Sequence, residues 1–379
     1  MYRNKLIGLI NLSESDYYIK QLTYNRPIAS IPFLGRYRII DFALSNLMNA
    51  GVDTVGIFLN DKYRSLMDHI KSGAEWDLDR KNGGIFYFSP YSNAETMTQL
   101  RGDIHNYFSN LDFLTEAHGE YVIITGSNMV CNIDYQDVLK QHLETKADVT
   151  VVYREVSQSN VHFDRCYTVT LNEYENVVAV GKNIKRKEVT DKDRKKISME
   201  MYLVKKELLV DLITDAVATG ENVYLTDVLH FASAKYKVKG YRFNGLVRCI
   251  NSTENYYKAS IDMLNENNIV DLFFQDRVIL TKVKDEVPSY YHPDSVVENS
   301  LIANGCKIEG TVRNSVLFRR VNVAKGAVVE NSIIMQNGDI RENSSLNCVI
   351  TDKQVIITEG TELKGDPKNP VVVDKGTIL

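Results

Sequence analysis

The chain has 379 residues, more than one ordinary hydrophobic core holds, so we expect two domains. Its hydrophobic content of 44% is enough to build cores of that size. The 45 basic and 49 acidic side chains give a net charge of -4, which excludes a global basic field for binding nucleic acid or a membrane surface.

Cysteine usage and the N-terminal segment indicate where the protein works. The five cysteines are widely spread and form no CxxC pair, which is typical of reduced thiols. The N-terminal segment reads as a first strand and not as a signal peptide, and no apolar run approaches the ~18 residues of a membrane span. We therefore expect a cytoplasmic protein without a membrane anchor.

The chain opens with a predicted strand over residues 5–12 (KLIGLINL). In many nucleotide-binding α/β folds the loop after this strand is rich in glycine, so that backbone N–H groups can approach phosphates closely. Here Ser13–Ile19 contains no glycine and carries Glu14 and Asp16, whose carboxylates would repel a triphosphate. This loop argues against nucleotide binding at the usual place.

A βαβ-like unit follows. The pattern predicts a helix over Asp41–Asn49, which Gly51 ends, and a strand over Val55–Leu59. Residues 76–110 are irregular, with Gly, Asn and Ser punctuation around a short FYF strand.

Residues Glu120–Tyr135 (EYVIITGSNMVCNIDY) have the layout of an active-site corner. Tyr121–Thr125 is predicted to be a strand buried on both faces, Ser127–Met129 follow it on a loop, and Asp134–Glu144 has helical spacing. Ligands bind at such loops in open α/β sheets. However, Asn128 offers an uncharged amide where Mg²⁺ would favour a carboxylate, so a simple turn residue is the alternative interpretation.

Farther along, a strand pair is predicted at Asp148–Tyr153 and Tyr167–Leu171, and helices at Lys206–Ala218 and Ser252–Asn265. Between them, Lys182–Lys196 (KNIKRKEVTDKDRKK) is densely charged. We interpret this run as a solvated loop, with contact to a phosphate as the alternative.

From Ser295 onward the pattern changes to a hexapeptide repeat. Near-copies of one motif (NSLIA, NSVLF, NSIIM, NCVIT) begin at Asn299, Asn314, Asn331 and Asn347. A second motif (IANGC, VAKGA, IRENS, ITEGT) begins at Ile302, Val323, Ile340 and Ile357. One aliphatic residue per hexapeptide is the signature of a parallel β-helix, in which inward aliphatic side chains stack along each face.

Hexapeptide acyltransferases, one class of protein with this repeat, need a catalytic histidine near the coils. None of the seven histidines lies in residues 294–379, which argues against that class.

Four segments, IPFLGRYRIIDFALSN, EYVIITGSNMVCNIDY, ENYYKAS and DEVPSYY, make the chain resemble glucose-1-phosphate adenylyltransferase (ADP-glucose pyrophosphorylase) over nearly its whole length. That family makes ADP-glucose from ATP and glucose 1-phosphate, with Mg²⁺, for glycogen and starch. The resemblance implies an α/β fold: a Rossmann-like nucleotidyltransferase domain over residues 1–270, a linker over 271–294, and a C-terminal left-handed parallel β-helix over 295–379.

The chain departs from the family at its catalytic motifs. The loop GGxGTRL matches Ser13–Ile19, with Tyr18 at the position of its arginine. The two metal-binding aspartates of the family match Asn128 and Cys249, and of the Glu-Lys-Pro that holds the sugar phosphate only Lys182 remains. Nucleotidyl transfer depends largely on electrostatic stabilisation by metal ions and cationic groups. We therefore expect no catalytic residue, metal or cofactor in this chain, and Lys182 as a remnant of substrate binding.

This pattern resembles the GlgD-type branch of the family, a degenerate partner of the catalytic GlgC-type subunit. The resemblance implies a non-catalytic or weakly active regulatory subunit in a hetero-tetramer, with Mg²⁺ bound by the catalytic partner. A weakly active nucleotide-sugar pyrophosphorylase and a purely structural assembly subunit stay open as alternatives.

The resemblance also implies a regulatory anion site for a phosphorylated metabolite. The residues that match it are Arg26, Arg38, His69, Lys282 and Lys284. Arginine forks and a histidine that converge on an anion suit a phosphate group. The alternative is that each of these side chains forms an ordinary ion pair within the chain.

Overall fold

The computed structural model describes residues 5–89, 102–158, 160–163, 165–182, 193–220 and 224–379. The chain divides into two compact units. The first comprises Met1–Glu14, Phe42–Val247 and Arg277–Leu280, and the second comprises Ser15–Asp41, Arg248–Asp276 and Thr281–Leu379. The second unit thus joins the repeat region to two segments that precede it in the sequence. The predicted domain boundaries at residues 270 and 294 stay predictions.

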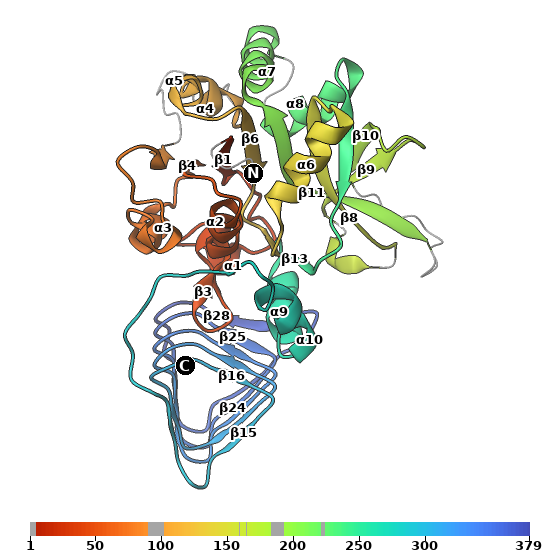
Figure 1. Ribbon diagram of the computed structural model, residues 1–379. Coiled ribbons are helices and arrows are strands. Elements are labelled where there is room, and N and C mark those ends of the chain that lie inside the picture. Colours follow the sequence, from red (N-terminus) through yellow and green to blue (C-terminus); the bar gives the residue numbers. More distant parts are fainter. Residues whose placement is uncertain (1–4, 90–101, 159, 164, 183–192, 221–223) are drawn as a thin grey trace. The chain divides into compact units, whose positions relative to one another are not determined.

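A mixed sheet of nine strands, counted over the described ranges, organises the first unit (Figure 1). Across the sheet the order is β10 (Val177–Lys182), β9 (Tyr167–Leu171), β11 (Arg194–Lys205), β6 (Tyr121–Thr125), β1 (Leu6–Asn11), β4 (Thr54–Phe58) and β5 (Gly84–Phe88). Two further strands extend the sheet: β8 (Val149–Ser157) pairs with β11, and β12 (Val238–Arg242) pairs with β8. β1 runs parallel to both β4 and β6, so the loops that follow β1 and β6 leave the same edge of the sheet.

Helices cover both faces of this sheet. Ile7 and Leu9 of β1 belong to a core cluster with α4 (Ile104–Phe108), α5 (Leu111–Glu116), α7 (Lys206–Thr219) and α8 (Leu225–Phe231). Gly8 faces the other way, because side chains alternate along a strand. A Cβ on Gly8 would lie 2.9 Å from Leu47 of α2 (Ile39–Asn49), so this helix packs directly on the strand.

The other elements are short. They are α1 (Lys20–Thr23), β2 (Pro32–Phe33), β3 (Tyr37–Arg38), α3 (Arg64–Ile70), β7 (Met129–Cys131), α6 (Tyr135–Thr145), β13 (Val247–Cys249), α9 (Thr253–Asp262) and α10 (Glu266–Phe273). Within the described ranges, every helix is too short or too polar to cross a bilayer.

A left-handed parallel β-helix with three five-stranded sheets forms most of the second unit, as its repeats predict (Figure 1). The first sheet contains β14 (Tyr290–Tyr291), β17 (Lys307–Ile308), β20 (Asn322–Val323), β23 (Asp339–Ile340) and β26 (Ile356–Ile357). The second contains β15 (Val296–Glu298), β18 (Thr311–Arg313), β21 (Val328–Glu330), β24 (Ser345–Asn347) and β27 (Glu362–Lys364). The third contains β16 (Leu301–Ile302), β19 (Val316–Leu317), β22 (Ile333–Ile334), β25 (Val349–Thr351) and β28 (Val371–Val373).

Within the second unit, helix α9 connects the β2–β3 hairpin to the β-helix. The hydroxyl of Tyr256 donates a hydrogen bond of 2.8 Å to the carbonyl oxygen of Pro32, in the β2–β3 hairpin. The neighbouring hydroxyl of Tyr257 donates one of 2.6 Å to the carbonyl oxygen of Asn331, in the β-helix. Both hydroxyls therefore find an acceptor, as buried tyrosines usually require.

Several predicted elements agree with the structure. β6 spans the predicted Tyr121–Thr125, and α6 follows it with its N-terminus capped by Asp134, whose side chain accepts from the backbone N–H of Gln136. Ser252 caps α9 in the same way. These local signals are strong because capping depends on residues adjacent in sequence.

Two predictions made from local pattern were wrong. β8 and β9 were expected to pair with each other, but each pairs with β11, which lies between them. Within the charged run Lys182–Lys196, residues 183–192 lie outside the described residues, while Arg194–Lys196 are in β11 and not in a loop. In both cases the reason is the long strand β11, whose first residues are charged and therefore resemble a loop in the sequence.

The repeat register also needed correction. The fourth motif copy is shifted by one residue, because Ile350 pairs with Ile333 and therefore Cys348, not Asn347, takes the place of Asn331. Similarly, the stack that contains Val323, Ile340 and Ile357 runs back through Ile308 to Tyr291, and Ile302 lies in another sheet. The 17-residue spacing of Val323, Ile340 and Ile357 identified their stack correctly, whereas the step from Ile308 to Val323 is two residues shorter.

One turn of the β-helix tests the role of asparagine in the repeat. Asn314 has φ 46°, in the left-handed region where a side chain with a Cβ costs roughly 1–2 kcal/mol and glycine costs little. Its side chain also accepts from Asn299 Nδ2 at 2.8 Å. Both Asn314→Gly and Asn314→Ala remove this bond, so their difference reports on the backbone alone. We expect the glycine variant to be more stable by about 1 kcal/mol in urea unfolding, and equal stabilities would contradict the assignment.

Candidate functional site

The edge of the sheet where β1 and β6 end carries the predicted active-site corner, and the chain's own carboxylate occupies it. Glu14, in the loop after β1, accepts hydrogen bonds from the backbone N–H of Ser127 and from its Oγ at 2.9 Å. The backbone of Asn128 donates to the same carboxylate. The carboxylate also lies against Gly126, where a Cβ would be 3.0 Å from Glu14 Oε1. Backbone N–H groups that could receive an anionic ligand therefore already bind an internal anion.

A second carboxylate fixes the loop that carries Glu14. Asp103 accepts from Asn11 Nδ2 at 2.5 Å, from Ser13 Oγ at 3.0 Å and from the backbone N–H of Leu225 at 2.8 Å. These bonds connect the end of β1 to the start of α8. The loop is thus held in place by side chains and does not need the glycines of a phosphate-binding loop.

A third carboxylate adds to the negative charge of this edge. Glu200 lies in a bulge of β11 between Ser198 and Met201, and it has φ 53°, which a residue with a Cβ rarely adopts. Burial, helped by the negative charges of Glu14 and Asp227, raises the pKa of Glu200 to about 7. Every charged group of the described chain that shifts this pKa is a carboxylate, so the site would repel phosphate.

The positions that match metal-binding aspartates do not suit Mg²⁺. Asn128 is 8% exposed and offers an amide, and Cys249 is 2% exposed and offers a thiol. Mg²⁺ favours anionic oxygen ligands in an octahedral arrangement. The described residues also contain no group of three or more His, Cys, Asp or Glu side chains placed to hold a metal ion. The amide of Asn128 and the thiol of Cys249 are thus not the anionic oxygen ligands that Mg²⁺ favours.

Tyr18 and Lys182 are the remaining two catalytic-motif positions. Tyr18, at the place of the family's arginine, is 53% exposed and packs edge-on against Tyr17. Its backbone carbonyl accepts from Thr253 N at 3.1 Å, so its ordered contact here is a backbone one at the start of α9. Lys182 closes β10, and its side chain lies outside the described residues.

Two of the predicted anion-site residues meet in the second unit. Arg26 is buried, with its Nη2 2.5 Å from Asp352 Oδ2. Burial, helped by the positive charges of Arg38 and Arg26 and opposed by Asp352, lowers the pKa of Lys353 to about 7. The cations therefore outnumber the single carboxylate that acts on Lys353, an arrangement that a bound anion would stabilise.

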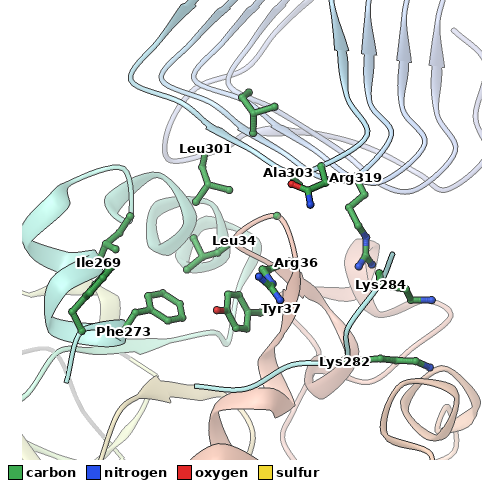
Figure 2. A pocket seen from close by; sticks show the side chains of 14 residues that line it. Leu34, Arg36, Tyr37, Ile269, Phe273, Lys282, Lys284, Leu301, Ala303 and Arg319 are labelled. Atoms are coloured by element: carbon green, nitrogen blue, oxygen red, sulfur yellow. The ribbon is translucent and has the colours of Figure 1, made fainter. Parts of the chain in front are cut away.

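The sequence analysis missed Lys353 and Asp352. The only local signal was a charged Asp-Lys pair directly after the apolar residues of the last NCVIT copy. Among the other predicted members, His69 belongs to the first unit, where its ring lies 6.0 Å from that of Trp76. Lys282 and Lys284 line a pocket of about 420 Å³ in the second unit, together with Arg36 and Arg319 (Figure 2). That pocket is not lined by Arg26, Arg38 or Lys353.

Comparison with known proteins places these features in context. Residues 19–162 match the family model for nucleotidyl transferases, and residues 287–376 match a GlmU-like, C-terminal hexapeptide model. The chain is 35% identical over 379 residues to the glycogen biosynthesis protein GlgD of Bacillus subtilis, covering 100% of this chain and 98% of that protein. It is 36% identical over 375 residues to GlgD of Geobacillus stearothermophilus, covering 99% and 97%. It is also 34% identical over 333 residues to the glucose-1-phosphate adenylyltransferase of Mycoplasma mobile, covering 87% and 86%.

The raised pKa of Glu200 predicts a pH dependence of stability. Its folded pKa of about 7 exceeds the ordinary value of 4.5, so the native state binds the extra proton between these values and stability falls as pH rises through this window. The side chain of the Glu200→Gln variant is neutral at every pH and neither binds nor releases this proton. From pH 4.5 to 8 the parent should lose up to about 3 kcal/mol more free energy of unfolding than the variant.

Urea unfolding at several pH values measures this difference. Glu207→Gln is the matched control, because Glu207 is exposed and pairs only weakly with Lys205 at 3.5 Å. Parallel curves for the parent and Glu200→Gln would show that Glu200 titrates normally.

Lys353 predicts a pH dependence of anion binding. Since its folded pKa is about 7, the amine loses its charge as pH rises through neutrality. Sulfate keeps its charge over this range, so its affinity should fall about tenfold or more from pH 6 to 8.5 in isothermal titration. Lys353→Arg keeps a positive charge throughout and should remove this dependence. The same slope in both proteins would contradict a role for Lys353.

Proposed function

The chain belongs to the glucose-1-phosphate adenylyltransferase family, alongside the GlgD glycogen biosynthesis proteins, and from this premise we propose that it is a non-catalytic regulatory subunit. It acts by assembling with a catalytic subunit of the same family. That partner makes ADP-glucose from ATP and glucose 1-phosphate with its own Mg²⁺. This chain contributes a response to anionic metabolites.

The observation that carries the proposal is the bond between Glu14 and the loop of Ser127 and Asn128. An ATP phosphate or a metal-bound oxygen at this edge would have to displace a carboxylate that already satisfies two backbone N–H groups and a hydroxyl. Displacement would leave Glu14 buried without those bonds, and a buried unpaired charge is costly. The site is therefore closed to nucleotide by its own side chain.

The electrostatics of the site support the same conclusion. Transfer of a nucleotidyl group develops negative charge that cationic groups and metal ions must stabilise. Here Glu14, Glu200 and Asp227 act together, and Asn128 brings no charge. Repulsion of this kind weakens both the binding of ATP and the stabilisation of the transition state.

The regulatory part of the proposal rests on the cations of the second unit. The positive charges of Arg26 and Arg38 both act on Lys353, and the buried pair of Arg26 and Asp352 holds one guanidinium in a fixed position. A preorganised guanidinium next to a second arginine suits a phosphate group. Lys353 and Asp352 belong to the β-helix, so an anion bound there would contact the β-helix directly.

The test is to assay this chain alone, the catalytic subunit alone and the two together for ADP-glucose formation from ATP and glucose 1-phosphate. The chain alone should give no turnover above background. In the mixed complex, the response to inorganic phosphate should differ from that of the catalytic subunit alone. The Lys353→Gln variant should abolish this difference, while the matched Arg341→Gln variant, whose exposed arginine pairs with Asp339, should keep it.

Each alternative gives a distinct result. Turnover by the isolated chain at roughly 1 to 1000 per second, the usual range of enzymes, would establish an active nucleotide-sugar pyrophosphorylase. Assembly with the catalytic subunit and an unchanged phosphate response in all variants would establish a purely structural subunit. Either result overturns the proposal.

A further inference from the structure

A cavity of about 340 Å³ lies in the first unit, at the edge of the sheet where β6 begins (Figure 1). We propose that it binds a small zwitterion, an α-amino acid with an apolar side chain. β6 is roughly 13 Å long at about 3.3 Å per residue, and it separates the cavity from the loop where Ser127 donates to Glu14. The cavity is therefore a different site from the candidate active-site edge, and its binding does not rest on the proposed function.

An apolar wall forms one part of the cavity. Its side chains come from β6, α6, α7 and the segment before β12, and they are Tyr121, Leu143, Ala147, Leu208 and Tyr236. Leu208 and Tyr236 also pack on the core cluster of this unit, which holds them in place. The volume falls within the roughly 300–1,000 Å³ of small-molecule sites, so this wall suits a small apolar group.

His142, near the end of α6, presents a hydrogen-bond donor to the cavity. It is only 3% exposed, and its Nδ1 lies 2.8 Å from Oγ1 of the fully buried Thr150. Among the described residues Nδ1 is the one partner of this hydroxyl, so Thr150 donates to Nδ1, and Nε2 carries the proton of the ring. Nε2 bonds to no described residue and is not one of their enclosed polar atoms, so it opens onto the cavity.

The donor from His142 carries no charge. Burial, opposed by the carboxylate of Asp148, lowers the pKa of His142 to about 4. The imidazole is therefore neutral at physiological pH, and its N–H can bind an acceptor without fixing the sign of the ligand. The charged side chains of the lining decide that sign.

Two side chains of opposite charge line the cavity at the turn between α6 and β8. Lys146 follows α6 with φ 49°, in the left-handed region where a residue with a Cβ is strained. Asp148 accepts from the backbone N–H of Lys237 at 2.8 Å, which orients its carboxylate. Neither Lys146 nor Asp148 forms an ion pair with another residue of the described ranges. Each is thus available to a ligand group of opposite charge.

Lys205, at the end of β11, is a further cation of the lining, but it already has partners. Its Nζ lies 3.5 Å from Glu207, and its charge also acts on Glu120. Exposed pairs of this kind are weak, so Lys205 adds a modest positive potential. The recognition of charge therefore depends on Lys146 and Asp148.

The class of ligand follows from these groups. A carboxylate would be bound by the ammonium of Lys146 and the N–H of His142, and an ammonium by Asp148. A simple carboxylate would bring a second negative charge towards Asp148, and a simple amine would repel Lys146. An α-amino acid carries both charges on one carbon atom, and an apolar side chain would contact the apolar wall.

Matched probes test the proposal by isothermal titration of the full chain at neutral pH. They are L-phenylalanine, hydrocinnamate, which lacks the ammonium, phenethylamine, which lacks the carboxylate, and glycine, which lacks the apolar side chain. L-phenylalanine should give saturable heat. Each of the other three should bind roughly tenfold or more weakly, because each leaves one part of the cavity unmatched.

Variants at exposed positions assign the binding to this cavity. Asp148→Asn keeps an acceptor for the N–H of Lys237 but removes the charge, so it should weaken L-phenylalanine roughly tenfold without weakening hydrocinnamate. Lys146→Gln should weaken both of these ligands, because both carry a carboxylate. Lys140→Gln is the matched control, since Lys140 is exposed on α6 outside the lining, and it should bind like the parent.

Three results would overturn the proposal. They are the absence of saturable L-phenylalanine binding at millimolar concentration, equal affinities for L-phenylalanine and hydrocinnamate, and unchanged L-phenylalanine binding in the variants of Lys146 and Asp148. These titrations use neither ATP nor a catalytic subunit. Their failure would therefore leave the proposed function standing, and failure of the proposed function would leave this binding site standing.

Discussion

The hydrogen bonds that Glu14 accepts from Ser127 and Asn128 are the constraint on which the account of this protein depends. They arise because β1 and β6 are parallel neighbours, so that the loops after both strands meet at one edge of the sheet. In a nucleotide-binding α/β fold the same edge presents backbone N–H groups to a phosphate. Here the side chain of Glu14 accepts hydrogen bonds from those N–H groups, and on this contact we base the proposal that nucleotide is excluded.

The candidate sites of the two units carry charges of opposite sign. The first unit gathers carboxylates at its sheet edge, where the strained Glu200 sits in a bulge and its charge is opposed by no cation of the described chain. The second unit gathers cations instead, around Lys353 and in the pocket with Arg319. In the described residues the carboxylates thus gather at the candidate active-site edge, and basic groups gather in the second unit, where the proposed function requires an anion site.

The sequence predicted features that depend on neighbouring residues or on a fixed period. The strand Tyr121–Thr125, the helical segment Asp134–Glu144 and the 17-residue stack of the β-helix belong to this group. The expected repulsion of phosphate by Glu14 rests on a local property, its charge, and stays a prediction. The partner of Glu14 was not predictable, since Ser127 lies 113 residues away and the contact depends on strand pairing. Lys353 was missed for the same reason, because only folding brings it to Arg26 and Arg38. The shift at Cys348 escaped detection since one residue moves a whole coil without changing its composition.

The most direct test of the central claim is a calorimetric titration of ATP with Mg²⁺ into the isolated chain at neutral pH. If Glu14 closes the sheet edge, the titration gives no saturable heat at concentrations up to about 1 mM, which corresponds to a binding free energy weaker than about -4 kcal/mol. Saturable, magnesium-dependent binding with a Kd near 1 μM, about -8 kcal/mol, would show that nucleotide reaches the site and would contradict the account.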